Sequence, residues 1–239
     1  MSDDTKLKLY GVPVSQPVRA VMWACLAKGL PFDFQMTMPG ARKGTRSEAF
    51  RKINPYGFTV PAIQDGDFTL GESHAILVYL ANKHGWDDLY PCDPRSRARV
   101  DQYLHWHHRN TREITIRLFA PVMRPDLKIP ADMVAQGAKV VQGVMSSIEG
   151  FLGATGAFLC GPAVTIADLA CYTEVGQCTD DFCALWPLGE DKYPNICRWI
   201  AAMRQYAAHD EAHEGLAAFA PNIREAVRAA NEAKAKAKL

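Results

Sequence analysis

The sequence has almost no net charge, no long apolar run and no paired-cysteine motif. Its 239 residues carry 27 Lys and Arg against 26 Asp and Glu. This balance indicates no nucleic-acid partner, which would require a basic surface. No apolar run reaches the roughly 20 residues that span a bilayer, so no membrane association is expected. The first residues are acidic and polar, so no secretory signal is expected and a cytoplasmic location is predicted.

The seven cysteines exclude further classes of site. Their number is odd and they form no C-x-x-C pair, so neither a disulfide scaffold nor a redox dithiol is predicted. Most are expected to be small buried apolar residues. The spacing of Cys178 and Cys183 matches no standard metal site. His105 and His108 lie one helical turn apart, so they could bind a metal ion. The other interpretation is that His108 is packed at the domain interface and that the neighbouring histidines are polar surface residues. No metal is therefore predicted.

The first 85 residues alternate between strand and helix patterns. The expected order is strand, helix, strand, short helix, strand, strand and helix, at residues 7–10, 17–28, 32–38, 47–52, 60–63, 68–70 and 72–83. This order predicts a βαβ unit followed by ββα, with a mixed four-stranded sheet. Residues 1–85 are therefore predicted to form one domain, and the Pro- and Asp-containing segment 86–94 a linker.

After the linker only helical patterns remain, so residues 95–239 are predicted to form an all-α domain. The expected helices are 95–119, 131–152, 166–177, 195–208 and 221–238. Thr165 and Asp168 have the spacing of a capping box, in which each residue satisfies a free backbone group at the helix start. The tail from residue 224 is expected to be a solvated, frayed helix.

Ser15 stands between the first strand and a helix that starts at Pro17. A serine in this position most often caps the helix, and this is the structural alternative. The functional interpretation is that its hydroxyl faces an anion at the positive helix end and stabilises a thiolate over a thiol. Lowering a thiol pKa from about 8.5 by about two units needs roughly 2.7 kcal/mol. One charge-assisted hydrogen bond contributes about 1.5–3 kcal/mol, which is enough.

Two further segments have features of a peptide-binding site. Pro61 inside a strand removes a ladder donor, and a cis Val60-Pro61 bond would turn the Val60 backbone outward to pair with an extended peptide. Glu72 and Ser73 open a helix, where the serine suits a carboxylate and the glutamate an ammonium. The structural alternatives are an ordinary edge-strand proline, a capping serine and a glutamate that complements the helix dipole.

In combination these motifs resemble the cytosolic glutathione transferases, and most closely their serine-type theta class. The resemblance rests on three segments in order, Ser15-Gln16-Pro17-x-Arg19-Ala20, Asn54-Pro55 with Val60-Pro61-Ala62, and Asp65-Gly66-Asp67-Phe68-Thr69-Leu70-x-Glu72-Ser73. It implies a thioredoxin-like α/β N-terminal domain, an all-α C-terminal domain and a homodimer. It also implies a detoxifying enzyme, in which glutathione is the co-substrate and Ser15 the catalytic residue.

The resemblance further implies a set of glutathione-binding residues. Val60 pairs with the peptide backbone, Glu72 and Ser73 hold the γ-glutamyl group, and Arg112 favours the thiolate through its charge. The theta-class histidine near Thr45 is absent here, so a neighbouring cation is expected to bind the glycyl carboxylate. The full expected set is Gln16, Lys43, Thr45, Arg46, Thr59, Val60, Pro61, Glu72, Ser73, Arg109 and Arg112.

The expected reaction is attack of the glutathione thiolate on a small, electrophilic and mostly apolar substrate. Dehalogenase or peroxidase side activity is a variant of this interpretation. The second substrate is expected between the domains, beside the helix at 95–119. The alternative function is a non-catalytic binding module, either a ligand carrier or an assembly domain of the translation machinery. Ser15 argues against this alternative, because a binding module needs no thiolate stabiliser.

Overall fold

The first strands of the chain form the mixed, four-stranded sheet that the sequence predicts. The computed structural model describes residues 6–236, and its strands are β1 (Leu7–Gly11), β2 (Phe32–Met36), β3 (Ala62–Asp65) and β4 (Phe68–Gly71). Their order in the sheet is β2-β1-β3-β4. Strand β1 runs parallel to β2 and antiparallel to β3, and β3 and β4 form a hairpin. This arrangement is thioredoxin-like.

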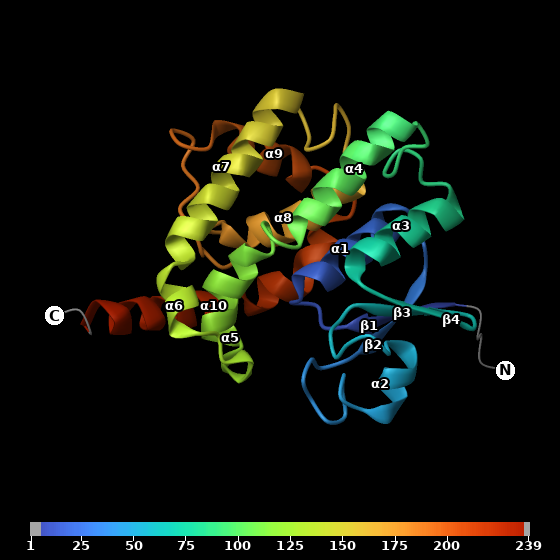
Figure 1. Ribbon diagram of the computed structural model, residues 1–239, viewed down its shortest axis with the longest axis horizontal. Coiled ribbons are helices and arrows are strands. Elements are labelled where there is room, and N and C mark those ends of the chain that lie inside the picture. The colour runs from blue at the N-terminus through green and yellow to red at the C-terminus, as the bar shows by residue number, and fades with distance from the viewer. Residues whose placement is uncertain (1–5, 237–239) are drawn as a thin grey trace.

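Three helices cover this sheet, α1 (Gln16–Ala27), α2 (Glu48–Ile53) and α3 (Ser73–His84). Helices α1 and α3 lie on the face that meets the second domain, and α2 lies on the opposite face (Figure 1). The apolar residues of α1 recur at helical spacing, and Val18, Val21 and Cys25 are fully buried. Burial of this stripe places the start of α1, and with it Ser15, at the boundary between the domains.

The second domain is all-helical, as predicted. Its helices are α4 (Pro94–His107), α5 (Ala120–Met123), α6 (Ala131–Ala135), α7 (Gly137–Thr155), α8 (Ile166–Val175), α9 (Pro194–Arg204) and α10 (His209–Lys236). A π-helical turn, η1 (Thr115–Phe119), and two 3-10 turns, η2 (Pro125–Leu127) and η3 (Gly176–Cys178), complete it. Every residue of α8 is buried, so α8 is the central helix of the molecule.

The prediction of one long helix over residues 95–119 is wrong. Helix α4 ends at His107, and helical backbone resumes at Glu113, directly before the π-helical turn that starts at Thr115. The intervening turn contains Asn110, whose side-chain amide donates to the Trp106 carbonyl at 2.8 Å. Such side chain–backbone bonds compete with helix propagation. The break turns the chain so that Arg112 reaches the boundary between the domains.

Other helix limits also differ from the predictions. The expected helix at 131–152 divides at Gln136 into α6 and α7, the one at 166–177 ends in η3, and the one at 195–208 ends at Arg204. The last helix begins at His209, and Pro221 lies inside it rather than at its start. Burial of Ala212, Leu216 and Ala220 extends this helix, so tertiary packing outweighs the proline signal. The end of the predicted helix, 237–238, lies outside the described residues.

The predicted capping box at the start of α8 is confirmed. The Asp168 carboxylate accepts a hydrogen bond from the Thr165 amide at 3.0 Å. It also accepts from the Leu159 amide at 2.9 Å and from the Trp199 indole at 3.0 Å. Asp168 therefore holds the start of α8, the preceding loop and α9 together.

The two domains share one continuous core, built around Trp23 of α1. Its indole donates to the Ala207 carbonyl at 2.8 Å. The rings of Tyr172, His209 and His213 meet it edge-on, with centroids 4.9–5.6 Å away. Helix α1 is thus enclosed by the sheet on one side and by α8 and α10 on the other, so its side chains contribute to the packing of both domains.

Candidate functional site

A cavity of about 160 Å³ lies between the two domains. The loop before β3 and the start of α3 line one side, and the turn after α4 and the end of α8 line the other. This volume is below the roughly 300–1,000 Å³ of typical small-molecule sites. A ligand the size of a tripeptide would therefore fill it and continue over the neighbouring surface. Six of the residues expected from the sequence line this cavity, and they are Thr59, Val60, Pro61, Glu72, Ser73 and Arg112.

The Val60-Pro61 bond is cis, as predicted. Strand β3 begins only at Ala62, so Val60 takes no part in the ladder that β3 forms. The side-chain amide of the buried Asn54 donates to the Thr59 carbonyl at 3.3 Å and supports this loop. Gly71 is required beside it, because a Cβ there would lie 2.8 Å from the Asn54 side-chain oxygen. The Asn54 side chain therefore supports the loop at the position where Val60 lines the cavity.

Glu72 has an unusual backbone, with φ 67° and ψ 111°. Non-glycine residues rarely adopt a positive φ, and such conformations cost about 1–3 kcal/mol. The structural alternative of a capping Ser73 is wrong, because Glu72 is the N-cap and Ser73 is the first helical residue. In the described chain the Glu72 carboxylate makes no capping hydrogen bond. The strain therefore turns an uncommitted carboxylate and the Ser73 hydroxyl toward the cavity.

Ser15 occupies the N-cap position of α1 with an extended backbone. Its amide donates to the Val12 carbonyl at 3.0 Å, and its carbonyl accepts from the Arg19 amide at 2.9 Å. Within the described chain its hydroxyl makes no capping hydrogen bond, which argues against the simple capping interpretation. Ser15 is half-buried and does not itself line the cavity, although Pro17 in the same turn does.

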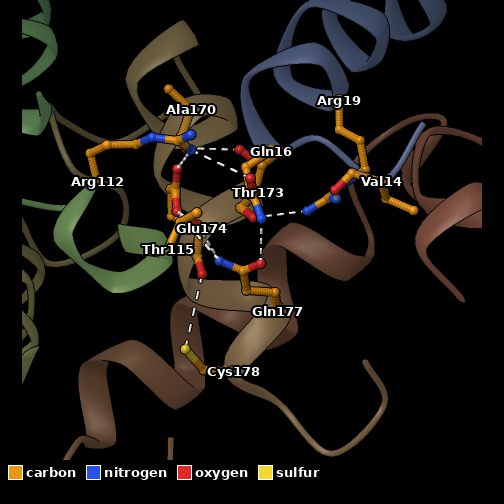
Figure 2. A network of polar contacts seen from close by, with 10 residues as sticks. All are labelled: Val14, Gln16, Arg19, Arg112, Thr115, Ala170, Thr173, Glu174, Gln177 and Cys178. Carbon is orange, nitrogen blue, oxygen red and sulfur yellow. Dashed lines mark hydrogen bonds and ion pairs between the residues drawn. The ribbon is translucent and has the colours of Figure 1, made fainter. Parts of the chain in front are cut away.

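Five side chains form a closed ring of polar contacts that includes Gln16, the residue after Ser15 (Figure 2). The Gln16 amide nitrogen donates to the Gln177 side-chain oxygen at 2.7 Å, and the Gln177 amide nitrogen donates to the Thr115 hydroxyl at 2.8 Å. Thr115 donates to the Glu174 carboxylate, which forms a 2.5 Å ion pair with Arg112. Arg112 closes the ring by donating to the Gln16 side-chain oxygen at 3.4 Å.

This ring changes the roles expected for Gln16 and Arg112. Gln16 is 3% exposed, and both ends of its amide are engaged, so its side chain links the two domains instead of offering a free contact. Arg112 lines the cavity, but the Glu174 carboxylate compensates its charge. Arg112, which was expected to act as a free cation, is thus one partner of an ion pair. Glu174 was not predicted, because a single acidic residue in an apolar helix matches no motif.

The remaining expected residues lie outside the cavity. Lys43 and Arg46 are exposed on the loop between β2 and α2, and Arg109 is exposed in the turn after α4. Thr45 is fully buried, and its hydroxyl accepts from the Gly40 amide at 2.9 Å. The Thr45 side chain therefore shapes the loop, and the exposed Lys43 and Arg46 are the members of the expected set on this loop that remain available to a carboxylate.

Three histidines, His74, His107 and His108, line the cavity. The ring of His74 lies 4.7 Å from that of His107 and 4.5 Å from that of His108. Burial lowers the pKa of His74 to about 3 and that of His107 well below its ordinary value, so both are neutral at pH 7. The expectation that His108 is packed and that His105 and His107 lie at the surface is confirmed only for His105, because His107 is buried and His108 is exposed.

The structure also bears on the predictions about metals, membranes and thiols. Across residues 6–236, no three His, Cys, Asp or Glu side chains are grouped so that they could bind a metal ion. No helix in the same range is long and apolar enough to cross a bilayer. All seven cysteines are free, and four of them are buried. Burial raises the pKa of Cys25 to about 12, so this thiol is unreactive.

Several known proteins that are similar to this chain in sequence or structure are glutathione transferases. Residues 9–91 match the family described as "Glutathione S-transferase, N-terminal domain". Glutathione S-transferase theta-1 of Mus musculus is 36% identical over 217 residues, which cover 87% of this chain and 88% of that protein. Glutathione S-transferase theta-1 of Homo sapiens is 34% identical, with the same coverage of both chains.

Solved structures agree with the sequence comparison. The apo form of human glutathione S-transferase T1-1 superposes with a TM-score of 0.73 and 31% identity, covering 93% of this chain and 96% of that chain. A delta-class glutathione transferase of Nilaparvata lugens superposes with a TM-score of 0.77 and 29% identity, covering 93% and 99% of the two chains. These similarities do not favour a non-catalytic binding module. They extend over both domains, and the chain therefore belongs to the glutathione S-transferase family, with theta-class members among its relatives.

Proposed function

We propose that this protein is a glutathione transferase in which Ser15 holds the glutathione sulfur as a thiolate. The observation that carries the proposal is the combination of the cis Val60-Pro61 loop and the strained Glu72-Ser73 turn in one cavity. Both segments present polar groups that the fold itself leaves uncommitted. The Ser15 hydroxyl, which makes no capping bond within the described chain, lies at the start of the helix beside them.

The proposed contacts follow from the chemistry of the tripeptide. The Val60 backbone and the neighbouring Thr59 and Pro61 suit an extended peptide segment. Ser73, at the positive end of α3, suits the γ-glutamyl carboxylate, and Glu72 suits the ammonium on the same carbon. The exposed Lys43 and Arg46 are the proposed cations for the glycyl carboxylate, with Thr45 shaping their loop and Arg109 as a more distant cation.

The charges around the start of α1 support an anionic sulfur. The guanidinium groups of Arg19 and Arg112 both interact with the single carboxylate of Glu174. Two positive charges and one negative charge leave a net charge of +1 in this cluster. The N-terminus of α1 adds a positive partial charge at the same place. A thiolate beside Ser15 is therefore favoured over the neutral thiol.

The proposed reaction has the thiolate attack an electrophilic carbon of a small, mostly apolar substrate held between the domains. Alignment of the two reactants supplies much of the acceleration in such a step. We further infer a cytoplasmic, homodimeric enzyme that acts in detoxification, with residues 1–85 as the glutathione domain, 86–94 as the linker and 95–239 as the second-substrate domain.

The proposal is tested by titrating glutathione and following thiolate formation by ultraviolet difference absorbance. The wild type should hold bound thiolate at neutral pH, and Ser15→Ala should lose it together with turnover. Ser47→Ala is the matched control, because the Ser47 hydroxyl accepts from the Phe50 amide at 3.1 Å and does cap a helix. It should cost about 1 kcal/mol of stability and leave the thiolate unchanged. A wild type without bound thiolate contradicts the proposal.

A further inference from the structure

The segment that carries Ser15 is fastened to the second domain on both sides of the serine (Figure 2). On the N-terminal side, the Arg19 guanidinium donates to the Val14 carbonyl at 2.7 Å and to the Thr173 carbonyl of α8 at 2.9 Å. On the C-terminal side, the Gln16 amide donates to Gln177 of η3 at 2.7 Å. The two residues that flank Ser15 are thus tied to the end of α8 and to the η3 turn that follows it.

These ties consist of polar groups in places where apolar side chains would be expected. Arg19 is fully buried, and the residues that its guanidinium contacts through hydrogen bonds offer carbonyl oxygens instead of a carboxylate. Its Nε has no partner among the described residues. Gln16 is 3% exposed and Gln177 is 1% exposed. Buried polar groups are costly unless fully paired, so stability alone does not account for this arrangement.

The position of Arg19 in the fold also matters. It lies in the first turn of α1, one turn from Ser15, and reaches across to the last turn of α8. The carbonyl at that end of α8 carries a negative partial charge, which suits a cation. The same side chain therefore bridges the start of one helix and the end of another, and the Val14 carbonyl is held between them.

We propose that Arg19 and Gln177 are positioning residues. They hold the backbone on either side of Ser15 in a fixed position relative to the second domain. The proposal rests on the function proposed above and adds that α8 and η3 are part of the thiolate site. A functional group has to be held within about 0.5 Å of its productive position to be effective. Among residues 6–236 Ser15 makes no side-chain capping bond that would fix it, so its neighbours supply the restraint.

The test measures the pKa of the glutathione thiol bound to Arg19→Lys and Gln177→Met, by ultraviolet absorbance of the thiolate. Lysine keeps the positive charge of Arg19 but lacks the planar fork that spans two carbonyls. Methionine keeps the approximate size of Gln177 but replaces the amide oxygen that accepts from Gln16 with a weakly accepting thioether. Each variant should raise the thiol pKa by about one unit and lower kcat about tenfold, with a smaller change in KM. Gln142→Met, an exposed position on α7, is the matched control and should change none of these values.

The outcomes separate the two proposals. If Ser15→Ala raises the thiol pKa and the two positioning variants lower only the unfolding midpoint, the roles of Arg19 and Gln177 are structural and the inference is wrong. If Arg19→Lys keeps the wild-type thiol pKa and Gln177→Met raises it, the positive charge at position 19 is sufficient and the two carbonyl hydrogen bonds of Arg19 are not needed. The part of the inference that concerns Arg19 is then wrong. A wild type without bound thiolate refutes the proposed function itself. If Gln177→Met does not fold, the double variant Gln16→Met/Gln177→Met removes both buried amides together, and its thiol pKa decides the question.

Discussion

Arg112 and Glu174 form a 2.5 Å ion pair at the cavity, and the two partners differ in their access to water. The side chain of Arg112 is 33% exposed, whereas that of Glu174 is 2% exposed. Water can therefore solvate the guanidinium when its partner is removed, but it cannot reach the carboxylate. The pair anchors the cation at the site and limits its charge.

This difference in solvent access predicts unequal effects of the two substitutions. Arg112→Leu removes the ion-pair partner of the buried Glu174 carboxylate and should lower the free energy of unfolding by about 3–5 kcal/mol. Glu174→Gln leaves a partly solvated guanidinium and should cost only about 1–2 kcal/mol. Urea denaturation measures both losses. The double variant Arg112→Leu/Glu174→Leu should lose less than the sum, and additive losses would contradict the coupling.

The strained backbone of Glu72 predicts a trade-off between stability and binding. Glu72→Gly should raise the free energy of unfolding by about 1 kcal/mol, because glycine accepts a positive φ without strain. The same change removes the proposed ammonium contact and should raise the KM for glutathione roughly tenfold. Glu72→Ala is the control, since it removes the carboxylate but keeps a Cβ at φ 67°. Equal stability of the two variants would show that the backbone stores no strain.

The buried histidines predict acid sensitivity. Burial, with Arg19 nearby, lowers the pKa of His213 from 6.5 to about 2. Between these values the unfolded chain binds a proton that the folded chain does not, so the free energy of unfolding falls as the pH drops below 6.5. His213 should contribute a loss of about 2 kcal/mol between pH 7 and pH 5.

Denaturation at several pH values measures this effect. His213→Phe should reduce the slope of stability against pH by about 1.4 kcal/mol per unit below pH 6. His105→Gln, which removes a histidine from the exposed face of α4, is the matched control and should leave the slope close to that of the wild type. An unchanged slope in His213→Phe would mean that this ring is solvated in the folded protein.

The contacts of Asp168 predict a large loss of stability on truncation. Asp168→Ala leaves the buried amides of Thr165 and Leu159 and the Trp199 indole without an acceptor. The expected loss is about 3 kcal/mol or more, measured by urea denaturation. Asp168→Asn keeps one acceptor and should lose less. Asp132→Ala, an exposed position in α6, should change stability by less than about 1 kcal/mol, and a similar loss there would remove the special role of Asp168.

Local sequence patterns predicted most of the N-terminal domain. The apolar spacing in α1, the Pro17 start and the hairpin turn between β3 and β4 are local features, and the structure has them where expected. The helices of the second domain were less predictable, because their limits depend on partners distant in sequence. Helix α10 runs through Pro221 because its apolar face packs against other elements. Helix α4 stops at His107 because of a turn held by local side-chain bonds.

For the candidate site, the sequence by itself determined which chemical groups are available. A serine before a proline-started helix, a Val-Pro pair and a Glu-Ser turn are readable because each depends on adjacent residues. Only the tertiary structure decided which groups are already engaged. It joined Gln16 to Gln177 and Arg112 to Glu174, across separations of 161 and 62 residues. Pairings between such distant residues depend on how the two domains pack, and no local pattern encodes them.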